Sequence, residues 1–486
     1  MTGLQRLSGN DALMLNMENP TTPMHTLKVA IVDPSRRGRP ITLDELVDVL
    51  PHYLGHFPRA TQRVEAASAT YSARPFWVAD ENFDVSAHLD ERTAAAPGDR
   101  RALDTILTEL SVEQLDRSRP LWALTLVNGL ADGQQAIVVR VHHAVADGLA
   151  ALNTFMTATA ERGGTVAPAP VGDIEAVQRE ELLRTARAES KKLFREVPKA
   201  TGRLVKGIVT SRRFENRHLV PKPMESSRNS FSAPSGGERR CASASLPLAQ
   251  FQQIAVATGT TVNGALHGVI AGAKRAEMIA RSEDLRSPAV TVFGVAADMA
   301  STRTAGNEIS TALAYLRTDI ADPVQRLTAT AQSCAAAVTK RRSIGFELTD
   351  QIAVYTGRTG PVFRKLAAPV TPRVVNNITT ANLPGPRETR WVGDIEVVDW
   401  ISFALAIAPA DVNLTAYSYA GRISMGLITT PESMPDPEGF LDRVRESLHE
   451  VRTALVERGM LAAQDADQSA AKPPTNPAAK PPKRVE

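Results

Sequence analysis

The pattern of apolar and polar positions in the first third of the chain predicts a strand hairpin with one helix before it and one helix after it. Apolar residues at helical spacing predict a helix over Asp104–Leu115. Two runs rich in β-branched residues, Leu121–Asn128 and Gln134–His142, are joined through Ala131-Asp132-Gly133, which is typical of a hairpin. A turn of small residues follows, and the helical pattern resumes over Leu149–Arg162.

The second half of the chain, from about Arg240, repeats this alternation of helices and strands. Its predicted elements are a mostly helical stretch over Leu248–Ala280, strands over Ala289–Ala296 and Ile309–Arg317, a helix from Asp322 to about Lys340, a hairpin of Leu414–Tyr419 and Arg422–Thr429, and a last helix from Asp436. Two such halves predict an α/β (α+β) fold.

Composition divides the chain into four segments. Residues 1–162 and 240–462 are the predicted halves, and residues 163–239, which begin with Gly and Pro, are the predicted helical linker between them. Residues 463–486 are rich in Ala, Lys and Pro and poor in larger apolar residues, so they are predicted to be a disordered tail.

The linker contains a strongly basic stretch, Arg179–Arg217, with twelve basic residues against five glutamates, a net charge of +7. Apolar residues recur among these charges at helical spacing, so the stretch is predicted to be a basic amphipathic helix that breaks at Pro198. Two roles fit this pattern equally: a solvated bridge between the halves, or a helix that lies on an anionic membrane surface.

The composition of the 486 residues, with 43% apolar and 22% charged residues, is that of an ordinary globular protein. A net charge of only +3 excludes nucleic-acid binding through the charge of the chain as a whole. No nucleic-acid partner is therefore expected. The two cysteines, Cys241 and Cys334, favour a reducing compartment. No signal peptide is recognisable and no apolar run approaches the roughly 18 residues of a membrane span, so we expect a cytoplasmic protein with only peripheral membrane contact.

Tandem histidines end the second strand of the first hairpin, in the sequence Val141-His142-His143-Ala144-Val145-Ala146-Asp147-Gly148. Because adjacent strand residues point to opposite faces, His142 and His143 do not easily hold one ion together, and no metal site is predicted. Strand-end histidines that only satisfy backbone groups are the plainer alternative. The tight turn with Asp147 and Gly148, however, forms a compact unit that can fix the orientation of an imidazole, as a general base requires.

The H-H-x-x-x-D-G pattern at a strand end resembles the catalytic motif of CoA-dependent acyltransferases with the chloramphenicol-acetyltransferase fold. Further segments narrow the resemblance to the bacterial wax ester synthase/diacylglycerol acyltransferase family, over about residues 5–460. These segments are Leu7-Ser8-Gly9-Asn10-Asp11-Ala12, Pro20-Thr21-Thr22-Pro23-Met24-His25, Leu115-Asp116-Arg117-Ser118-Arg119-Pro120-Leu121-Trp122, Asn382-Leu383-Pro384-Gly385-Pro386 and Ser418-Tyr419-Ala420-Gly421-Arg422. The resemblance implies two chloramphenicol-acetyltransferase-like halves with mixed sheets and a central channel at their interface.

The resemblance implies that His143 is the general base, that Asp147 is mainly structural and that His142 is a neighbour. The strand pattern agrees, since His143 shares its face with Val139 and Val141. The implied reaction moves a long-chain acyl group from acyl-CoA to diacylglycerol, with long-chain alcohols as a second class of acceptor. Acyl-CoA is then a substrate, and no cofactor is expected.

Two further features of the motif follow from the residues. Gly148 is predicted to permit the turn. A buried Asp147 needs a cationic partner, which the sequence does not identify; Arg59 and Arg63 are only candidates.

One position departs from the family pattern. An Asn-Asp pair is expected at the start of a helix, and this chain has Asn263-Gly264 there. Asn263 is a candidate substrate-binding residue, and a helix-capping asparagine is the alternative. The stretch Phe403–Val412 also lacks the glycine pattern expected before the final hairpin, so the acyl pocket is not assigned.

Two other functions fit parts of the sequence. Condensation domains and polyketide-associated acyltransferases share the motif, but no carrier or adenylation segment is recognisable here. A degenerate acyl-CoA- or lipid-binding protein is suggested by Gly264, whereas the intact His143 and Asp147 favour an enzyme. The expected partners are acyl-CoA, diacylglycerol or a long-chain alcohol, and a membrane or lipid-droplet surface.

Overall fold

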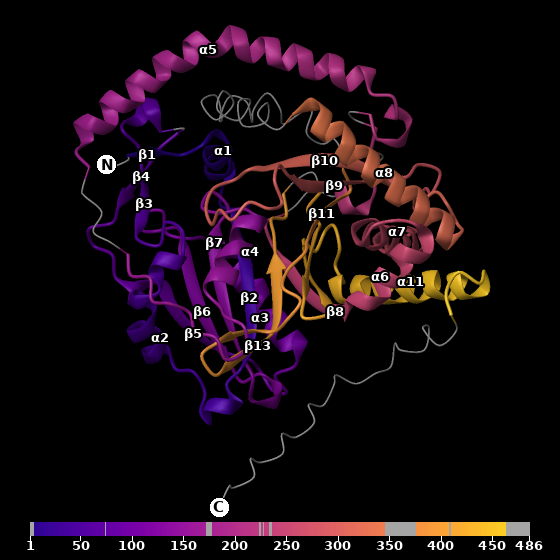
Figure 1. Ribbon diagram of the computed structural model, residues 1–486, viewed down its shortest axis with the longest axis horizontal. Helices are drawn as coiled ribbons and strands as arrows, with labels where there is room; N and C mark the ends of the chain where they lie inside the picture. Colours follow the sequence, from indigo (N-terminus) through magenta and orange to yellow (C-terminus); the bar gives the residue numbers. More distant parts are fainter. Residues whose placement is uncertain are drawn as a thin grey trace, which may run out of the picture.

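The computed structural model describes residues 4–72, 74–171, 177–222, 225–226, 228–232, 236–345, 376–407 and 410–462. The predicted disordered tail, residues 463–486, lies outside them. The described part of the chain forms two mixed six-stranded sheets and one three-stranded sheet, with helices packed against them (Figure 1). The predicted α/β class with mixed sheets is therefore confirmed.

The first large sheet carries the predicted hairpin at its centre and has the order β12-β13-β2-β7-β6-β5. β2, β7 and β6 are antiparallel, whereas β5 is parallel to β6. The bounds in this half are α1 (Gly9–Met17), β2 (His25–Asp33), α2 (Leu43–Val49), β5 (Leu89–Thr93), α3 (Arg100–Val112), β6 (Trp122–Asn128), β7 (Gln135–His142) and α4 (Gly148–Thr157), with β1 (Gln5–Arg6), β3 (Gln62–Glu65) and β4 (Phe76–Ala79) in the small sheet.

The outer edge of this sheet comes from the other end of the chain. β13 (Ile395–Phe403) pairs antiparallel with β2, and β12 (Arg390–Val392) pairs with β13. The apolar pattern predicts no strand at these positions. The segment boundaries proposed from composition stay a prediction; β12 and β13 of the predicted second half complete the sheet of the first half.

The second large sheet has the order β10-β9-β11-β14-β15-β8, in which β11 runs parallel to both of its neighbours. The predicted strand positions and the last hairpin are confirmed to within about a residue. The bounds are β8 (Arg240–Pro247), α6 (Leu248–Thr258), α7 (Val262–Ala280), β9 (Ala289–Ala296), β10 (Ile309–Leu316), α8 (Pro323–Ile344), β11 (Ile378–Leu383), β14 (Asn413–Tyr419), β15 (Arg422–Thr429) and α11 (Pro437–Glu457).

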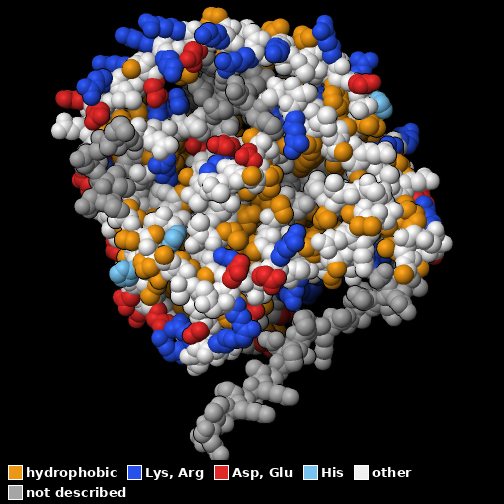
Figure 2. Space-filling model, viewed as in Figure 1, with side chains coloured by type: hydrophobic (Ala, Val, Ile, Leu, Met, Phe, Trp, Pro, Cys, Tyr) orange, Lys and Arg blue, Asp and Glu red, His pale blue; other side chains and the backbone are white. Residues whose placement is uncertain are grey.

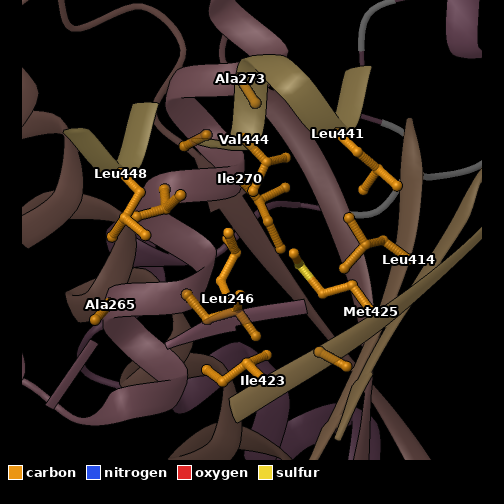
Figure 3. Close-up of a cluster of buried hydrophobic side chains, with 14 of the residues drawn as sticks. Leu246, Ala265, Ile270, Ala273, Leu414, Ile423, Met425, Leu441, Val444 and Leu448 are labelled. Atoms are coloured by element: carbon orange, nitrogen blue, oxygen red, sulfur yellow. The ribbon is translucent and has the colours of Figure 1, made fainter. Parts of the chain in front are cut away.

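The largest apolar core lies between this second sheet and the helices α6, α7 and α11. In Figure 3, Leu414 and Met425 of the sheet lie close to Ile270 of α7 and to Leu441 and Val444 of α11. The stripe predicted for the last helix is buried as a whole, because its apolar residues recur at helical spacing and all face the core: Leu441, Val444, Leu448, Val451 and Leu455.

The basic stretch forms a long helix, α5 (Arg179–Arg213), that arches over the outside of the molecule (Figure 1). The break predicted at Pro198 is wrong, since the helix continues through this residue. Pro198 lies on the exposed middle of the helix. The start of α5 is anchored by the buried Leu182 and Ala186, whereas its middle is exposed.

Candidate active site

The two histidines lie where β7 turns into α4. The backbone N–H of His142 donates to the carbonyl oxygen of Leu121 at 3.0 Å, and that of His143 donates to the carbonyl oxygen of Met24 at 2.7 Å. The N–H of Val145 then donates back to the carbonyl oxygen of His142 at 2.9 Å and closes the turn. The sharp turn therefore follows directly from the end of the strand ladder.

The two faces of β7 differ as the alternation predicts. Arg140 and His142 are buried, whereas Val139, Val141 and His143 are half-buried. Lys28 of β2 lies opposite Val139 in the strand register, so its side chain lies on the same face as His143. Polar and titratable groups thus share the more open face of the first sheet.

The His142 ring is fully buried and serves the turn. Its Nδ1 accepts a hydrogen bond from the backbone N–H of Ala144 at 3.0 Å, so the hydrogen of the neutral ring is on Nε2. This Nε2 lies 3.7 Å from a carboxylate oxygen of Glu18. Burial, followed by the charge of Arg117, lowers the pKa of His142 well below its usual value. The buried His142 ring therefore holds the backbone of the turn.

The His143 ring is held neutral by its surroundings. Burial lowers the pKa of His143, and the ammonium of Lys28 acts in the same direction. The carboxylate of Asp147 and the side chain of Asn307 act in the opposite direction. Since a lowered pKa keeps the imidazole unprotonated at neutral pH, His143 is available to accept a proton.

The buried carboxylate of Asp147 joins the two halves of the chain. Its Oδ1 caps α4 by accepting from the N–H of Ala150 at 3.0 Å. Its Oδ2 accepts from Nη2 of Arg303 at 2.5 Å and from the N–H of Glu308 at 3.0 Å. All of these bonds orient the turn and the start of the helix.

Neither of the two candidate partners of Asp147 contacts it. Arg63 pairs instead with Glu65, and Arg59 donates to Gln62 at 2.7 Å. The true partner, Arg303, lies in the loop between β9 and β10, 156 residues further along the chain. No periodic pattern marks that loop, so sequence reasoning missed it.

The loop that carries Arg303 forms a short ladder with the turn. The N–H of Gly306 donates to the carbonyl oxygen of Val145 at 2.7 Å, and the N–H of Asp147 donates to the carbonyl oxygen of Gly306 at 3.2 Å. Gly306 has φ of +80°, a conformation that favours glycine. The second half of the chain therefore fixes the geometry of the motif in the first half.

Asn307, the next residue, contacts His143 directly. Its Nδ2 donates to the carbonyl oxygen of His143 at 2.6 Å and to Oδ1 of Asp11 at 2.8 Å. Asp11 belongs to the segment near the N-terminus that carries part of the family resemblance. Asp11 is part of a sequence segment that resembles the family, whereas nothing in the sequence marks Asn307 as a residue of the site.

Asn263 lies in the first turn of α7 and is not its cap. Thr261 is the cap, because its Oγ1 accepts from the N–H of Gly264 at 3.0 Å. The Oδ1 of Asn263 accepts from Nδ2 of Asn382 at 3.3 Å, which ties this helix to the Asn-Leu-Pro-Gly-Pro segment. The capping alternative for Asn263 is therefore wrong, and its role in binding substrate stays a prediction.

The glycine that replaces the family's acid packs against a neighbouring helix. A Cβ atom at Gly264 would lie 2.8 Å from the Cβ of Ala331 in α8. An aspartate at this position would force α7 and α8 apart. The departure from the family pattern is thus explained by helix packing.

Gly148 has a structural role that differs from the one expected. It does not adopt the left-handed conformation that would make glycine necessary for a turn. A Cβ atom here would lie 2.8 Å from Oη of Tyr417 and 3.0 Å from Cδ1 of Leu383. A side chain at this position would make Tyr417 or Leu383 shift, because the start of α4 touches the second sheet.

No three His, Cys, Asp or Glu side chains in the described part of the chain come together as a metal site would need. No single described helix is long and apolar enough to cross a membrane, and α6 with α7 meets the length and composition requirement only as a pair bent by 100°.

The two mixed-sheet halves, with the H-H-x-x-x-D-G turn in the first of them, have the fold of the chloramphenicol-acetyltransferase-like class. Residues 7–266 match the wax ester synthase/diacylglycerol acyltransferase catalytic domain, and residues 305–452 match the C-terminal domain of the same family. The chain belongs to the wax ester synthase/diacylglycerol acyltransferase family.

Relatives cover nearly the whole chain. Two Mycobacterium tuberculosis H37Rv proteins, both provisionally named diacylglycerol O-acyltransferases, are 29% and 27% identical over 93% and 92% of this chain and 96% and 90% of their own length. The solved wax ester synthase/diacylglycerol acyltransferase from Marinobacter aquaeolei VT8 matches with a TM-score of 0.67 and 20% identity over 94% of this chain and 100% of its own. The first condensation domain of the CDA synthetase shares the fold at a TM-score of 0.53 and 15% identity, covering 93% of this chain and 96% of its own.

Proposed function

We propose that this protein transfers a long-chain acyl group from acyl-CoA to the free hydroxyl group of diacylglycerol and so forms triacylglycerol. The observation that carries this proposal is a neutral, half-buried His143 on the open face of the first sheet, in a turn held by the second half of the chain. Names of the mycobacterial relatives support diacylglycerol as acceptor. The Marinobacter relative supports a long-chain alcohol as a second acceptor.

The proposed reaction uses His143 as its only proton-transfer group. Nε2 of the neutral ring takes the proton of the acceptor hydroxyl group, and the alkoxide oxygen bonds to the thioester carbonyl carbon. The carbon–sulfur bond then breaks, and the imidazolium returns its proton to the CoA thiolate. No covalent enzyme intermediate is required, and Asp147 and His142 act as structural residues of the turn.

A lipid surface is the proposed place of the reaction, since the acceptor resides in a membrane or lipid droplet. The middle of α5 exposes an apolar row at helical spacing, formed by Val197, Leu204, Val205, Ile208 and Val209. Figure 2 shows Lys and Arg side chains along the rim of the molecule where α5 lies, with apolar side chains among them. Exposed apolar area beside positive charge is what binds a helix to an anionic surface, so we place this cytoplasmic protein peripherally on such a surface.

The test of the reaction is an assay of the purified protein with palmitoyl-CoA and diacylglycerol, hexadecanol or no acceptor, in which both thiol release and ester product are measured. Thiol release coupled to triacylglycerol formation supports the proposal. Thiol release without an acceptor identifies a thioesterase instead. Binding of palmitoyl-CoA without turnover identifies a lipid-binding protein.

A further inference from the structure

A lysine lies on the more open face of the first sheet, close to the catalytic turn. In the strand register, Lys28 of β2 lies between Val139 of β7 and Ser402 of β13. It therefore shares its face with His143. Its charge acts on the His143 ring, and the carboxylate of Asp147 acts on its amine. Lys28 thus places a positive charge next to the proposed base.

The neighbours of Lys28 on this face are mostly apolar. Ala30 follows it on β2, and Val139 and Val141 lie on β7, and all three are half-buried, as Lys28 is. A face that only has to hold hydrocarbon chains is best served by apolar residues, because a charge taken out of water is costly. The ammonium group of Lys28 therefore needs polar partners.

The contacts within the protein use only part of the hydrogen-bonding capacity of this group. Nζ of Lys28 donates to Oγ of Ser402 at 2.6 Å and lies 5.7 Å from the centre of the Tyr417 ring. No carboxylate in the described part of the chain is close enough to form a salt bridge with it. Burial lowers the pKa of Lys28 to about 8, against the effect of Asp147, so the amine is protonated at pH 7. An ammonium group has three hydrogens, and two of them remain for a ligand.

The position of Lys28 favours a ligand group a few bonds away from the reacting atoms. Lys28 lies opposite Val139, four residues before His143, and its amine forms no hydrogen bond with the His143 ring. A donor that stabilises the oxyanion has to lie within about 3 Å of the reacting carbonyl oxygen, beside the base itself. In diacylglycerol, two ester carbonyl oxygens lie a few bonds away from the free hydroxyl group. A long-chain alcohol has no such acceptor.

We propose that Lys28 is a specificity-determining residue that donates a hydrogen bond to an ester carbonyl oxygen of diacylglycerol, while the free hydroxyl group of the same molecule lies at His143. Lys28 takes no part in proton transfer and favours an acceptor that carries ester groups over a plain alcohol. This inference rests on the proposed transfer to diacylglycerol.

The test compares two acceptors of nearly the same shape, dioleoylglycerol and its ether analogue di-O-oleylglycerol, which lacks the ester carbonyl groups. With saturating palmitoyl-CoA, the wild-type protein is expected to have a kcat/KM about 10- to 100-fold higher for the ester, as loss of a hydrogen bond from a charged donor predicts. Lys28→Met keeps the length of the side chain and removes the charge. It is expected to lose this preference and to keep its kcat/KM for the ether.

A second substitution, Lys28→Gln, retains a hydrogen-bond donor without the charge. It is expected to keep part of the preference for the ester, and it gives the same measurement if the methionine variant does not fold. The matched control is Thr26→Val, because Thr26 lies on the same strand and face, opposite Val141. This variant removes a hydroxyl group and leaves the ammonium group in place, so it should prefer the ester as strongly as the wild-type protein does.

Three results overturn the inference. A wild-type protein that uses both acceptors equally well has no ester recognition to explain. An unchanged preference in Lys28→Met means that Lys28 does not contact the ester groups. An equal loss with both acceptors means that Lys28 acts on the reacting carbonyl group or on the fold. Failure of the proposed function is distinguishable, since the wild-type protein then transfers the acyl group to neither acceptor.

Discussion

Arg303 and Asp147 form a buried ion pair with a 2.5 Å hydrogen bond between the loop that follows β9 and the first residue before α4. Asp147 lies in the matched catalytic domain, and Arg303 lies between the two matched domains, two residues before the C-terminal one. The turn that presents His143 is therefore held by residues from both halves of the chain.

Removal of this carboxylate is expected to affect stability as well as rate. Asp147→Ala leaves a mostly buried guanidinium without its partner and α4 without its cap, so the free energy of unfolding should fall by about 3 kcal/mol or more. Asp147→Asn retains the helix cap, so its free energy of unfolding should fall by less than that of Asp147→Ala. Denaturant unfolding of both variants measures the difference. A fully stable but inactive Asp147→Ala protein would assign Asp147 a direct catalytic role.

Restoring the acid of the family pattern is expected to harm this protein. Gly264→Asp places a side chain against Ala331 and should destabilise the second half by roughly 1–3 kcal/mol, because α7 and α8 have to separate. Gly264→Ala, which adds only the Cβ atom, should show part of the same loss. The measurement is the melting temperature of each variant. A gain in activity at unchanged melting temperature would place position 264 in the substrate channel after all.

The contact between α3 and β8 is expected to weaken as the pH rises. Asp104 accepts hydrogen bonds from Ser243 at 2.7 and 2.9 Å, and burial raises the pKa of Asp104 to about 7. The unfolded chain loses this proton near the ordinary value of 3.8, so the folded state binds the extra proton between about pH 4 and 7.

Stability should therefore fall with rising pH in this range by at most about 1.4 kcal/mol per pH unit from this residue. Asp104→Asn should flatten that slope. Urea unfolding at several pH values measures it. An identical slope in the variant and the wild-type protein would mean that Asp104 is already ionised in the folded state.

The basic helix is expected to hold the protein on anionic lipid. Lys191, Lys192 and Arg195 are exposed on α5, so their reversal to Glu leaves the fold intact. Each positive charge near such a surface contributes about 1 kcal/mol, and salt weakens the effect. The triple variant should be released from phosphatidylserine-containing liposomes and should turn over a soluble short-chain acceptor normally. Equal liposome binding of variant and wild-type protein at low and high salt would leave α5 as a bridge between the halves.

Local features of the fold and site could be predicted from the sequence, whereas long-range ones could not. The β6–β7 hairpin and the stripe of α11 follow from patterns of neighbouring residues, and the motif itself is contiguous. The pairing of β13 with β2 joins residues more than 300 positions apart and leaves no periodic signal. Arg303 and Asn307 act through a loop, where residue identity alone does not show which buried group it meets.

The central claim, that His143 is the base, is tested most directly by the rate of triacylglycerol formation from palmitoyl-CoA and diacylglycerol in His143→Ala, with His142→Ala as the neighbouring control. General base catalysis contributes about 10²- to 10⁴-fold, so His143→Ala should lose nearly all transfer and still bind palmitoyl-CoA. His142→Ala should lose less, because its ring only supports the turn. Normal turnover in His143→Ala together with a greater loss in His142→Ala would contradict the account.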